Sequence, residues 1–512
     1  MRRIAYAFLV VVLSFSTIHA QTQAGAPSDP KVKKALTVDD YAKWKSINSS
    51  SISGDGKWVT YVLALTNTTP QESKPVMHLI RLDTNQDVEV AQATNPAFSN
   101  DSKWVAYQID PANAGGRGGR GRGGAGAAPA PGATTPNAQP TAQPRRVELR
   151  NLSTGAVQAW QDVASFTFSA SSNYIVLRRR AANAAQGTAG RGAAGGGAPG
   201  GAPAGPQGAP APEPTGPRGS DVILHDLVTG HDQFLGSVAD IAFNKAGDLL
   251  AYDVDAMPRD GNGLFVLDLQ SGRVVPIDND AKVYNRLQWS DAGTGLAVLK
   301  GVDVEKMRER DNTLLVYANI RQMIGSAEAA PAKLDKTANG FPKGFVISDR
   351  APLDWSGDGK RVFFGIKEQV AAPDTARRKS TDEVADVDVW NTKDERLQSV
   401  QMTRADQDRN FSYRESFDVG PAKFVKLADS TMRDVAISQD GRWAVGQDAR
   451  AYISDYKRPA ADIYRVNTST GERTLIVKGQ LTGQHILGIS PDGKEFVFWK
   501  DNKFQAYNLD AN

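Results

Sequence analysis

The sequence of 512 residues contains no cysteine, and this absence excludes several kinds of chemistry. Without cysteine there is no disulfide framework, thiol nucleophile, thiolate metal site or lipid-modified amino-terminal cysteine. A clear excess of either sign of charge is also absent: lysine and arginine outnumber aspartate and glutamate by only 60 − 57 = 3. So small an excess does not favour a polyanion as partner. We predict no nucleic-acid partner and no cofactor.

Long apolar runs are absent beyond the amino terminus. Two arginines precede an apolar run at residues 4–15, and Ala20 ends a passable cleavage site. This pattern is typical of a secretory signal peptide, predicted at residues 1–20, followed by a linker at 21–36. The run is short for a membrane span, and an uncleaved anchor is the alternative. We therefore predict a periplasmic or secreted protein without membrane contact once the signal is removed.

Catalytic signatures are missing as well. The nucleophile elbow of α/β-hydrolases needs glycine two residues before and two after the serine. No serine meets this condition, and the nearest stretch, Gly488-Ile489-Ser490-Pro491-Asp492, lacks the second glycine. Adjacent acidic residues at 39–40, 382–383 and 394–395 are expected to be solvated loop or cap charges. No residue is assigned a catalytic role, and the substrate-binding residues are unknown.

Histidine is scarce, and four remain after the predicted cleavage. None has the spacing of a zinc or manganese site, such as two histidines on one helical face. We predict isolated structural roles and no metal ligand, while a cluster drawn from distant parts of the chain stays an alternative. These residues are His78, His225, His231 and His485.

What the chain has in abundance is one short turn motif. In five copies a serine is followed two residues later by aspartate, and three degenerate copies lie between them. Aspartate can accept hydrogen bonds from the backbone of a turn, and the glycine found in most copies takes positive φ without steric cost. An apolar strand flanks the turn on each side. The residues that head the eight copies are Ser53, Ser99, Ser169, Asn244, Ser290, Ser356, Ser438 and Ser490.

The repeats predict an all-β protein. Their shortest separation, from Ser53 to Ser99, is 46 residues, and each copy is followed by further short strands and turns. Four antiparallel strands at such a period are typical of a β-propeller blade. We predict a propeller over residues 37–512 with eight four-stranded blades, the last incomplete; seven blades and a β-sandwich are the alternatives. A short helix is expected from Thr37, whose pairing with Asp40 resembles a capping box.

Two segments interrupt the repeats. Residues 112–144 and 181–219 contain no Val, Ile, Leu, Met, Phe, Tyr or Trp, so they cannot bury enough apolar surface to order themselves. Both are predicted to be disordered surface loops between the second and third strands of their blades. The Arg-Gly run at 115–124 resembles a nucleic-acid-binding tail, but aromatic residues for base stacking are not nearby.

Longer runs of the sequence resemble exported bacterial members of the prolyl oligopeptidase family of serine peptidases. They begin with "LTVDDYAKWKSINSSSISGDGKWVTYVL" at 36–63 and "NGLFVLDLQSGRVVPID" at 262–278. The runs "RVFFGIKE" at 361–368, "KDERLQSVQ" at 393–401 and "ADIYRVNTSTGERTLI" at 461–476 continue the similarity. The resemblance covers nearly all of the predicted mature chain outside the two low-complexity segments.

The resemblance implies an amino-terminal propeller that limits access to a carboxy-terminal α/β-hydrolase domain with a Ser, Asp, His triad. Eight blades would match the dipeptidyl peptidase IV branch, which holds the free amino terminus of the substrate with a Glu-Glu pair. The chain contains no adjacent pair of glutamates, which puts dipeptide release in doubt. No substrate-binding or triad residue can therefore be transferred to this sequence.

The leading hypothesis is a non-catalytic, substrate-gating propeller portion of an exported serine peptidase that acts on peptides. Its hydrolase domain is expected outside the chain, because Asn512 aligns with the glycine of a turn one strand short of a finished blade. One alternative is a stand-alone periplasmic propeller that binds a protein partner, resembling the Tol-system propellers. The other is a lyase or glycosidase with its site in the central channel.

Overall fold

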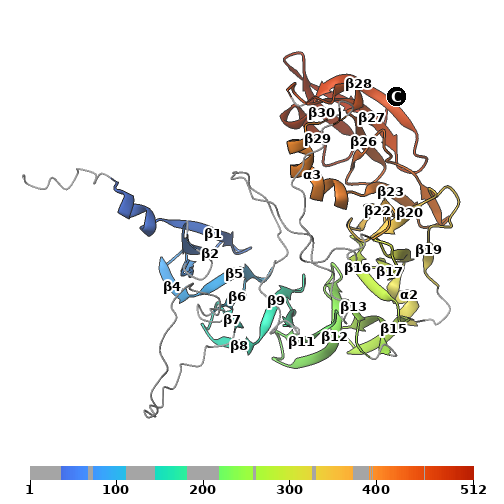
Figure 1. Ribbon diagram of the computed structural model, residues 1–512. Helices are drawn as coiled ribbons and strands as arrows, with labels where there is room; N and C mark the ends of the chain where they lie inside the picture. The colour runs from blue at the N-terminus through green and yellow to red at the C-terminus, as the bar shows by residue number, and fades with distance from the viewer. Residues whose placement is uncertain are drawn as a thin grey trace, which may run out of the picture.

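The computed structural model describes residues 36–511, except 67, 69–72, 111–144, 181–217, 258–260, 326–329, 373–390, 392–393, 395 and 455. The described chain is an all-β protein of propeller type, as the repeats predict, and its antiparallel sheets follow one another in chain order (Figure 1). The predicted signal peptide and all but two residues of the two low-complexity segments lie outside the described residues. Among the described helices, none is long and apolar enough to cross a membrane.

The first two repeats each form a four-stranded sheet in sequence order. Strands β6 and β7 flank residues 112–144, so this segment joins a second and a third strand, as predicted. The strands are β1 (Lys45–Ile52), β2 (Trp58–Leu65), β3 (Val76–Arg81), β4 (Gln86–Ala91), β5 (Ala93–Phe98), β6 (Trp104–Ile109), β7 (Arg146–Asn151) and β8 (Val157–Gln161).

The third and fourth repeats share one sheet of seven strands. The long strand β12 pairs with β11 through its first half and with β13 through its second half. The two repeats are thus continuous, seven sheets carry the eight repeats, and eight blades stay a prediction. The strands are β9 (Val163–Phe168), β10 (Tyr174–Arg179), β11 (Ser220–Asp226), β12 (Asp232–Phe243), β13 (Leu249–Val254), β14 (Gly263–Asp268) and β15 (Arg273–Asn279).

The fifth to seventh repeats form one sheet each, and the eighth forms a sheet of three strands. The short strand β21 pairs with β22 beside β20. The strands are β16 (Val283–Trp289), β17 (Leu296–Val302), β18 (Asp311–Tyr317), β19 (Ala332–Leu334), β20 (Phe345–Ser348), β21 (Asp354–Trp355), β22 (Arg361–Glu368), β23 (Tyr413–Asp418), β24 (Lys423–Val425), β25 (Asp434–Ile437), β26 (Trp443–Asp448), β27 (Ala460–Asn467), β28 (Arg473–Leu481), β29 (Ile486–Ile489), β30 (Glu495–Lys500) and β31 (Lys503–Asn508).

Each of the eight predicted turns precedes the second strand of its repeat, and all share one hydrogen bond. The side-chain oxygen of the heading Ser or Asn accepts the backbone N–H five residues later at 2.9–3.1 Å. In the five copies with aspartate, the serine hydroxyl also donates to that carboxylate at 2.5–2.6 Å. In Asp55 and Asp492 this hydrogen bond is the main cause of a lowered pKa.

The turns also bind one another. The backbone N–H of Asp55 donates to Ser102 Oγ at 3.1 Å, and that of Asp101 donates to Ser172 Oγ at 3.0 Å. The next two links are Ser171 Oγ to the Gly247 carbonyl at 3.2 Å and the Asn244 side-chain amide to the Gly293 carbonyl at 3.1 Å. One motif therefore closes each hairpin and connects the first five repeats in series.

The core is divided into seven apolar clusters, and each lies between two consecutive repeats. Alternate residues of a strand enter different clusters, because successive side chains point to opposite faces of a sheet. In β13, Leu250 packs toward the third repeat and Leu249 toward the fifth. In β17, Val298 packs toward the fourth repeat and Leu299 toward the sixth. No cluster of described residues joins the first repeat to the eighth.

Helices are few, as predicted. The helix expected from Thr37 is a 3₁₀-helix, and the Asp40 carboxylate accepts both the backbone N–H and the hydroxyl of Thr37 at 3.0 Å. The sequence did not predict the thirteen-residue helix between β22 and β23, which contains no buried residue and thus shows no apolar stripe. The helices are η1 (Val38–Lys43), α2 (Ile320–Gly325), α3 (Gln398–Asn410), η5 (Arg450–Tyr452) and η6 (Gly483–His485).

The turn bond makes Ser356→Ala a test of the fold. Ser356 is 1% exposed, and its loss leaves the Arg361 N–H without its side-chain acceptor. We expect a fall of about 1–3 kcal/mol in the free energy of unfolding, measured by urea denaturation. The matched control is Ser271→Ala in the exposed turn before β15, expected to change that free energy by less than about 0.5 kcal/mol. Equal effects of the two changes would contradict the role of the motif.

Candidate functional site

A cavity of about 740 Å³ lies among the third to sixth repeats. Its wall contains residues of β10, β12 and β16 together with segments that follow β13, β17 and β20. Charged side chains dominate the wall, and the two signs nearly balance. The charged lining residues are Arg178, Arg218, Arg286, Arg310, Arg350, Asp240, Asp255, Asp303 and Asp349.

Irregularities in two first strands bring these side chains to the cavity. The pairing register shifts between Val238 and Ile241 in β12 and between Asn285 and Gln288 in β16. Arg286, inside the second shift, has a φ of 59°, which few residues other than glycine adopt. Such bulges re-aim side chains that a regular strand would place on its faces.

Several wall residues hold one another in place. The backbone N–H of Arg286 donates to Asp240 Oδ2 at 3.2 Å, and its Nε donates to the Asp349 carbonyl at 2.7 Å. Arg310 pairs with Asp303 at 2.8 Å and with Asp349 at 3.4 Å. The contacts span three repeats, so the charged wall is a cross-linked surface rather than a set of separate side chains.

Arg218 anchors a second part of the wall. Its Nε lies 3.2 Å from Asp255 Oδ2, and its Nη2 donates to the Tyr284 carbonyl at 2.6 Å. The next residue, Gly219, passes so close to the neighbouring backbone that a Cβ would lie 2.3 Å from the Ser237 carbonyl oxygen. Only glycine fits there, which explains how Arg218 can reach the site.

Asp253 lies behind this wall and is fully buried. Its Oδ1 accepts the backbone N–H of Asp240 at 2.5 Å, while Arg218 Nη2 is 3.6 Å from its Oδ2. Burial, and then the charge of Asp240, raise the pKa of Asp253 to about 7. Burial also lowers the pKa of Arg178. The site therefore holds a carboxyl group that changes charge near neutral pH.

The wall is rich in groups that bind charged ligands. Its described lining residues include five arginines and four aspartates but no Ser, Thr, Cys, Tyr, His or Lys. Guanidinium groups recognise carboxylates and phosphates through charge-assisted hydrogen bonds, and carboxylates recognise ammonium groups. Because positive and negative side chains are nearly equal in number, the cavity suits a ligand that carries both signs of charge.

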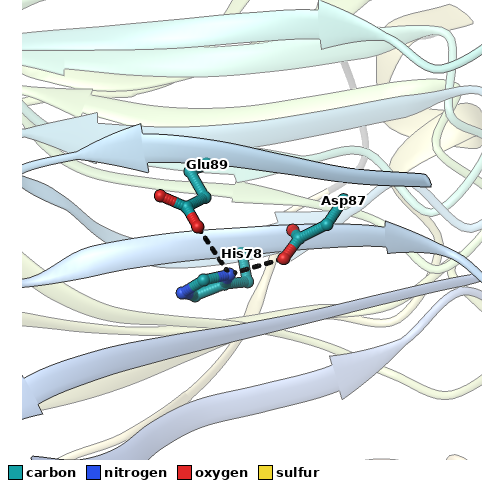
Figure 2. Close-up of side chains that lie close together, drawn as sticks. All are labelled: His78, Asp87 and Glu89. Atoms are coloured by element: carbon teal, nitrogen blue, oxygen red, sulfur yellow. Dashed lines mark hydrogen bonds and ion pairs between the residues drawn. The ribbon is translucent and has the colours of Figure 1, made fainter. Parts of the chain in front are cut away.

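The four histidines lie in β3, in β11, after the turn that follows β11, and in η6 before β29. His225 is buried, and its Nδ1 is 2.6 Å from Asp232 Oδ1 against the ring of Trp160, a structural role. His78 lies beside two carboxylates of the adjacent strand, Asp87 and Glu89 (Figure 2). Sequence reasoning missed this cluster because it looked for helical spacing.

The other sequence-predicted charges are unremarkable. Asp40 caps η1, as expected for a cap charge. The pair at 382–383 lies outside the described residues, as does residue 395 of the pair at 394–395. The cavity residues were also missed, although Asp240 interrupts the apolar residues of "VADIAF" at 238–243, and the adjacent Asn285 and Arg286 interrupt the alternation of "VYNRLQW" at 283–289. That interruption is a sequence signal for a bulge.

Comparison with known proteins leaves the family open. No family model matches the chain, and no curated protein matches it. The β-propeller domain of the trilobed protease from Pyrococcus furiosus is 10% identical with a TM-score of 0.31, over 86% of this chain and 97% of that one. Acylaminoacyl peptidase from Pyrococcus horikoshii is 9% identical with a TM-score of 0.32, over 86% of this chain and 53% of that one.

A eukaryotic initiation factor is 10% identical with a TM-score of 0.41, over 93% of this chain and 87% of that one. All three TM-scores lie below 0.5. The fold assignment rests on the strand pairing described above. The chain spans about half the length of the acylaminoacyl peptidase it matches.

Substitution of Asp253 tests the buried charge. The folded protein keeps a proton on Asp253 that the unfolded chain releases between about pH 4 and pH 7, so the free energy of unfolding falls as pH rises through this window. Asp253→Asn keeps the acceptor for Asp240 but cannot ionise. From pH 5 to pH 8, we expect the variant to gain roughly 1–3 kcal/mol relative to the unsubstituted protein in urea denaturation.

The control for this measurement is Asp335→Asn. Hydrogen bonds from Thr337 hold the pKa of Asp335 below its ordinary range, so this carboxylate is ionised at both pH values. Its substitution is expected to change the free energy of unfolding equally at pH 5 and pH 8. An Asp253→Asn variant with the same flat difference would show that Asp253 is already ionised at pH 5.

Proposed function

We propose that the chain is the propeller portion of an exported serine peptidase that acts on peptides, with the catalytic triad on a hydrolase domain outside the chain. The support from sequence is the set of runs that resemble the prolyl oligopeptidase family. In the structure these runs coincide with repeat elements: 262–278 covers β14, its turn and β15, and 461–476 covers β27 and the start of β28. The similarity therefore includes strands and turns together.

The observation that carries the proposal is the charged cavity. In this role it holds a segment of a peptide, whose ends and side chains carry both signs of charge. The guanidinium groups of Arg286 and Arg310 face the α-carboxylate or acidic side chains of the peptide, and the aspartates face its amino groups. A wall of cross-linked charges suits a part that admits and orients the substrate while another part cleaves it.

The proposal includes export, which rests on the predicted signal peptide at 1–20. Peptides in the periplasm or medium are then the substrates, and the dipeptidyl peptidase IV branch is the finer assignment favoured by eight repeats. The chain has no adjacent glutamates that could serve as the Glu-Glu pair of that branch. We therefore propose peptide binding without assigning the bond that is cleaved.

Arg286→Met tests the binding role. The change keeps the unbranched stem of the side chain and removes its charge. For a fluorescent tetrapeptide with an acetylated amino terminus and a free α-carboxylate, we expect a rise in Kd of about tenfold or more, because a charge-assisted hydrogen bond contributes about 1.5–3 kcal/mol. Fluorescence anisotropy gives the Kd, and the same peptide as its amide reports binding without the carboxylate.

The control is Arg273→Met on the exposed strand β15, away from the cavity, which should leave the Kd unchanged. A free-acid peptide that binds Arg286→Met as tightly as the unsubstituted protein would remove Arg286 from the site. No peptide binding to the unsubstituted chain would remove the cavity from the proposed function.

A separate measurement tests whether the chain carries a catalytic serine. A fluorophosphonate probe for active-site serines should leave the purified chain unlabelled, and coding sequence beyond codon 512 should continue into a strand, a Gly-x-Ser-x-Gly turn and a helix. Labelling of the chain would place the nucleophile within it. A stop codon followed by an unrelated gene would favour the stand-alone binding propeller.

A further inference from the structure

A second cluster of chemically active side chains lies on the outer hairpin of the first sheet, apart from the cavity. In the β3–β4 pairing, His78 is directly opposite Glu89, and Ile80 is opposite Asp87. Side chains two residues apart point to the same face of a strand, so His78, Asp87 and Glu89 share one face. Figure 2 shows the two carboxylates directed toward the same edge of the imidazole ring.

The possible ligand atoms of the cluster lie close together, and His78 Nδ1 shares a hydrogen bond with Asp87 Oδ2. His78 Nδ1 is 2.8 Å from Asp87 Oδ2 and 4.0 Å from Glu89 Oε1, and one ligand atom from each residue lies within 4.8 Å of the others. Around a tetrahedral zinc ion with bonds of about 2.1 Å, ligand atoms are about 3.4 Å apart. The separations of 2.8 and 4.0 Å lie about 0.6 Å on either side of this value, so small side-chain adjustments would bring the ligands to one ion.

The three side chains differ in freedom. The ring of His78 stacks on Tyr61 with centroids 4.9 Å apart and an interplanar angle of 11°, and its side chain is only 12% exposed. Glu89 is 68% exposed and can adjust at little cost. The imidazole of His78 is thus held in place, Asp87 already contacts it, and Glu89 can move toward an ion. These features make the site partly preorganised.

We propose that His78, Asp87 and Glu89 bind a divalent transition-metal ion, with Zn²⁺ as the representative ion. The donor set of one imidazole nitrogen and two carboxylate oxygens suits zinc and its neighbours, whereas calcium prefers oxygen ligands throughout. The ligands come from the third strand and the edge strand β4. The ion would therefore clip the edge strand to the sheet.

The test is calorimetric titration of the full chain, free of any affinity tag, with Zn²⁺ alone and with Ca²⁺ alone. We expect one Zn²⁺ per chain and at least tenfold weaker binding of Ca²⁺. His78→Ala and Glu89→Gln should each weaken Zn²⁺ binding by about tenfold or more. Because Glu89 is exposed, Glu89→Gln is not expected to unfold the hairpin, and it keeps the test informative if His78→Ala does.

The control variant is His231→Ala, an exposed histidine that follows a turn in the third repeat. It should bind Zn²⁺ as the unsubstituted protein does, and Zn²⁺ should raise the Tm of both but not of Glu89→Gln. Binding that survives Glu89→Gln unchanged, or that is lost in His231→Ala, would overturn the proposed site. Failure of the unsubstituted chain to bind Zn²⁺ would leave the cluster as an ion pair only.

Discussion

The hydrogen bond from the backbone to the heading Ser or Asn of each turn is the interaction on which the architecture depends. It fixes the first hairpin of every repeat, and in five copies the same serine draws an aspartate into the turn. Because the turns of the first five repeats also bind one another, hairpin closure and the alignment of neighbouring repeats are parts of one network. A fault in the second, third or fourth turn is therefore expected to affect both of its neighbours.

This alignment explains why the strands are apolar on both faces. A sheet between two others buries every second residue of a strand against each neighbour, as Leu249 and Leu250 do. Among the described residues, the first and eighth repeats each share an apolar cluster with one neighbour, and Ile47 of β1 and Phe504 of β31 are 66% and 68% exposed. Stability accumulates from one interface to the next, as in other repeat architectures.

The sequence was sufficient to predict the class of fold, because turn residues at fixed offsets and alternating apolar residues are local signals. All eight turns lie where expected, and Leu509 after β31 is buried and donates its backbone N–H to a carbonyl, as Leu227 after β11 does. The helix α3 could not be predicted, since it buries nothing and has no apolar stripe. The cavity was missed for another reason: Arg218, Arg310 and Arg350 belong to three different repeats and line one cavity only once these repeats pack together. The cluster around His78 was easier to predict from the sequence, because the register of two neighbouring strands alone brings its three residues together.

The bulges of β12 and β16 connect the repeat architecture to the charge of the cavity. By shifting register they release Asp240 and Arg286 from the sheet faces, and the N–H of Asp240 is left to bind the buried Asp253. Asp253 is mostly protonated below about pH 7, and its loss of negative charge makes the net charge around the cavity more positive. An anion bound beside this group favours its protonated form in turn, because binding and protonation at neighbouring sites are thermodynamically linked. We therefore expect anion binding in the cavity to be coupled to the charge of Asp253, which lies behind the wall and does not line the cavity.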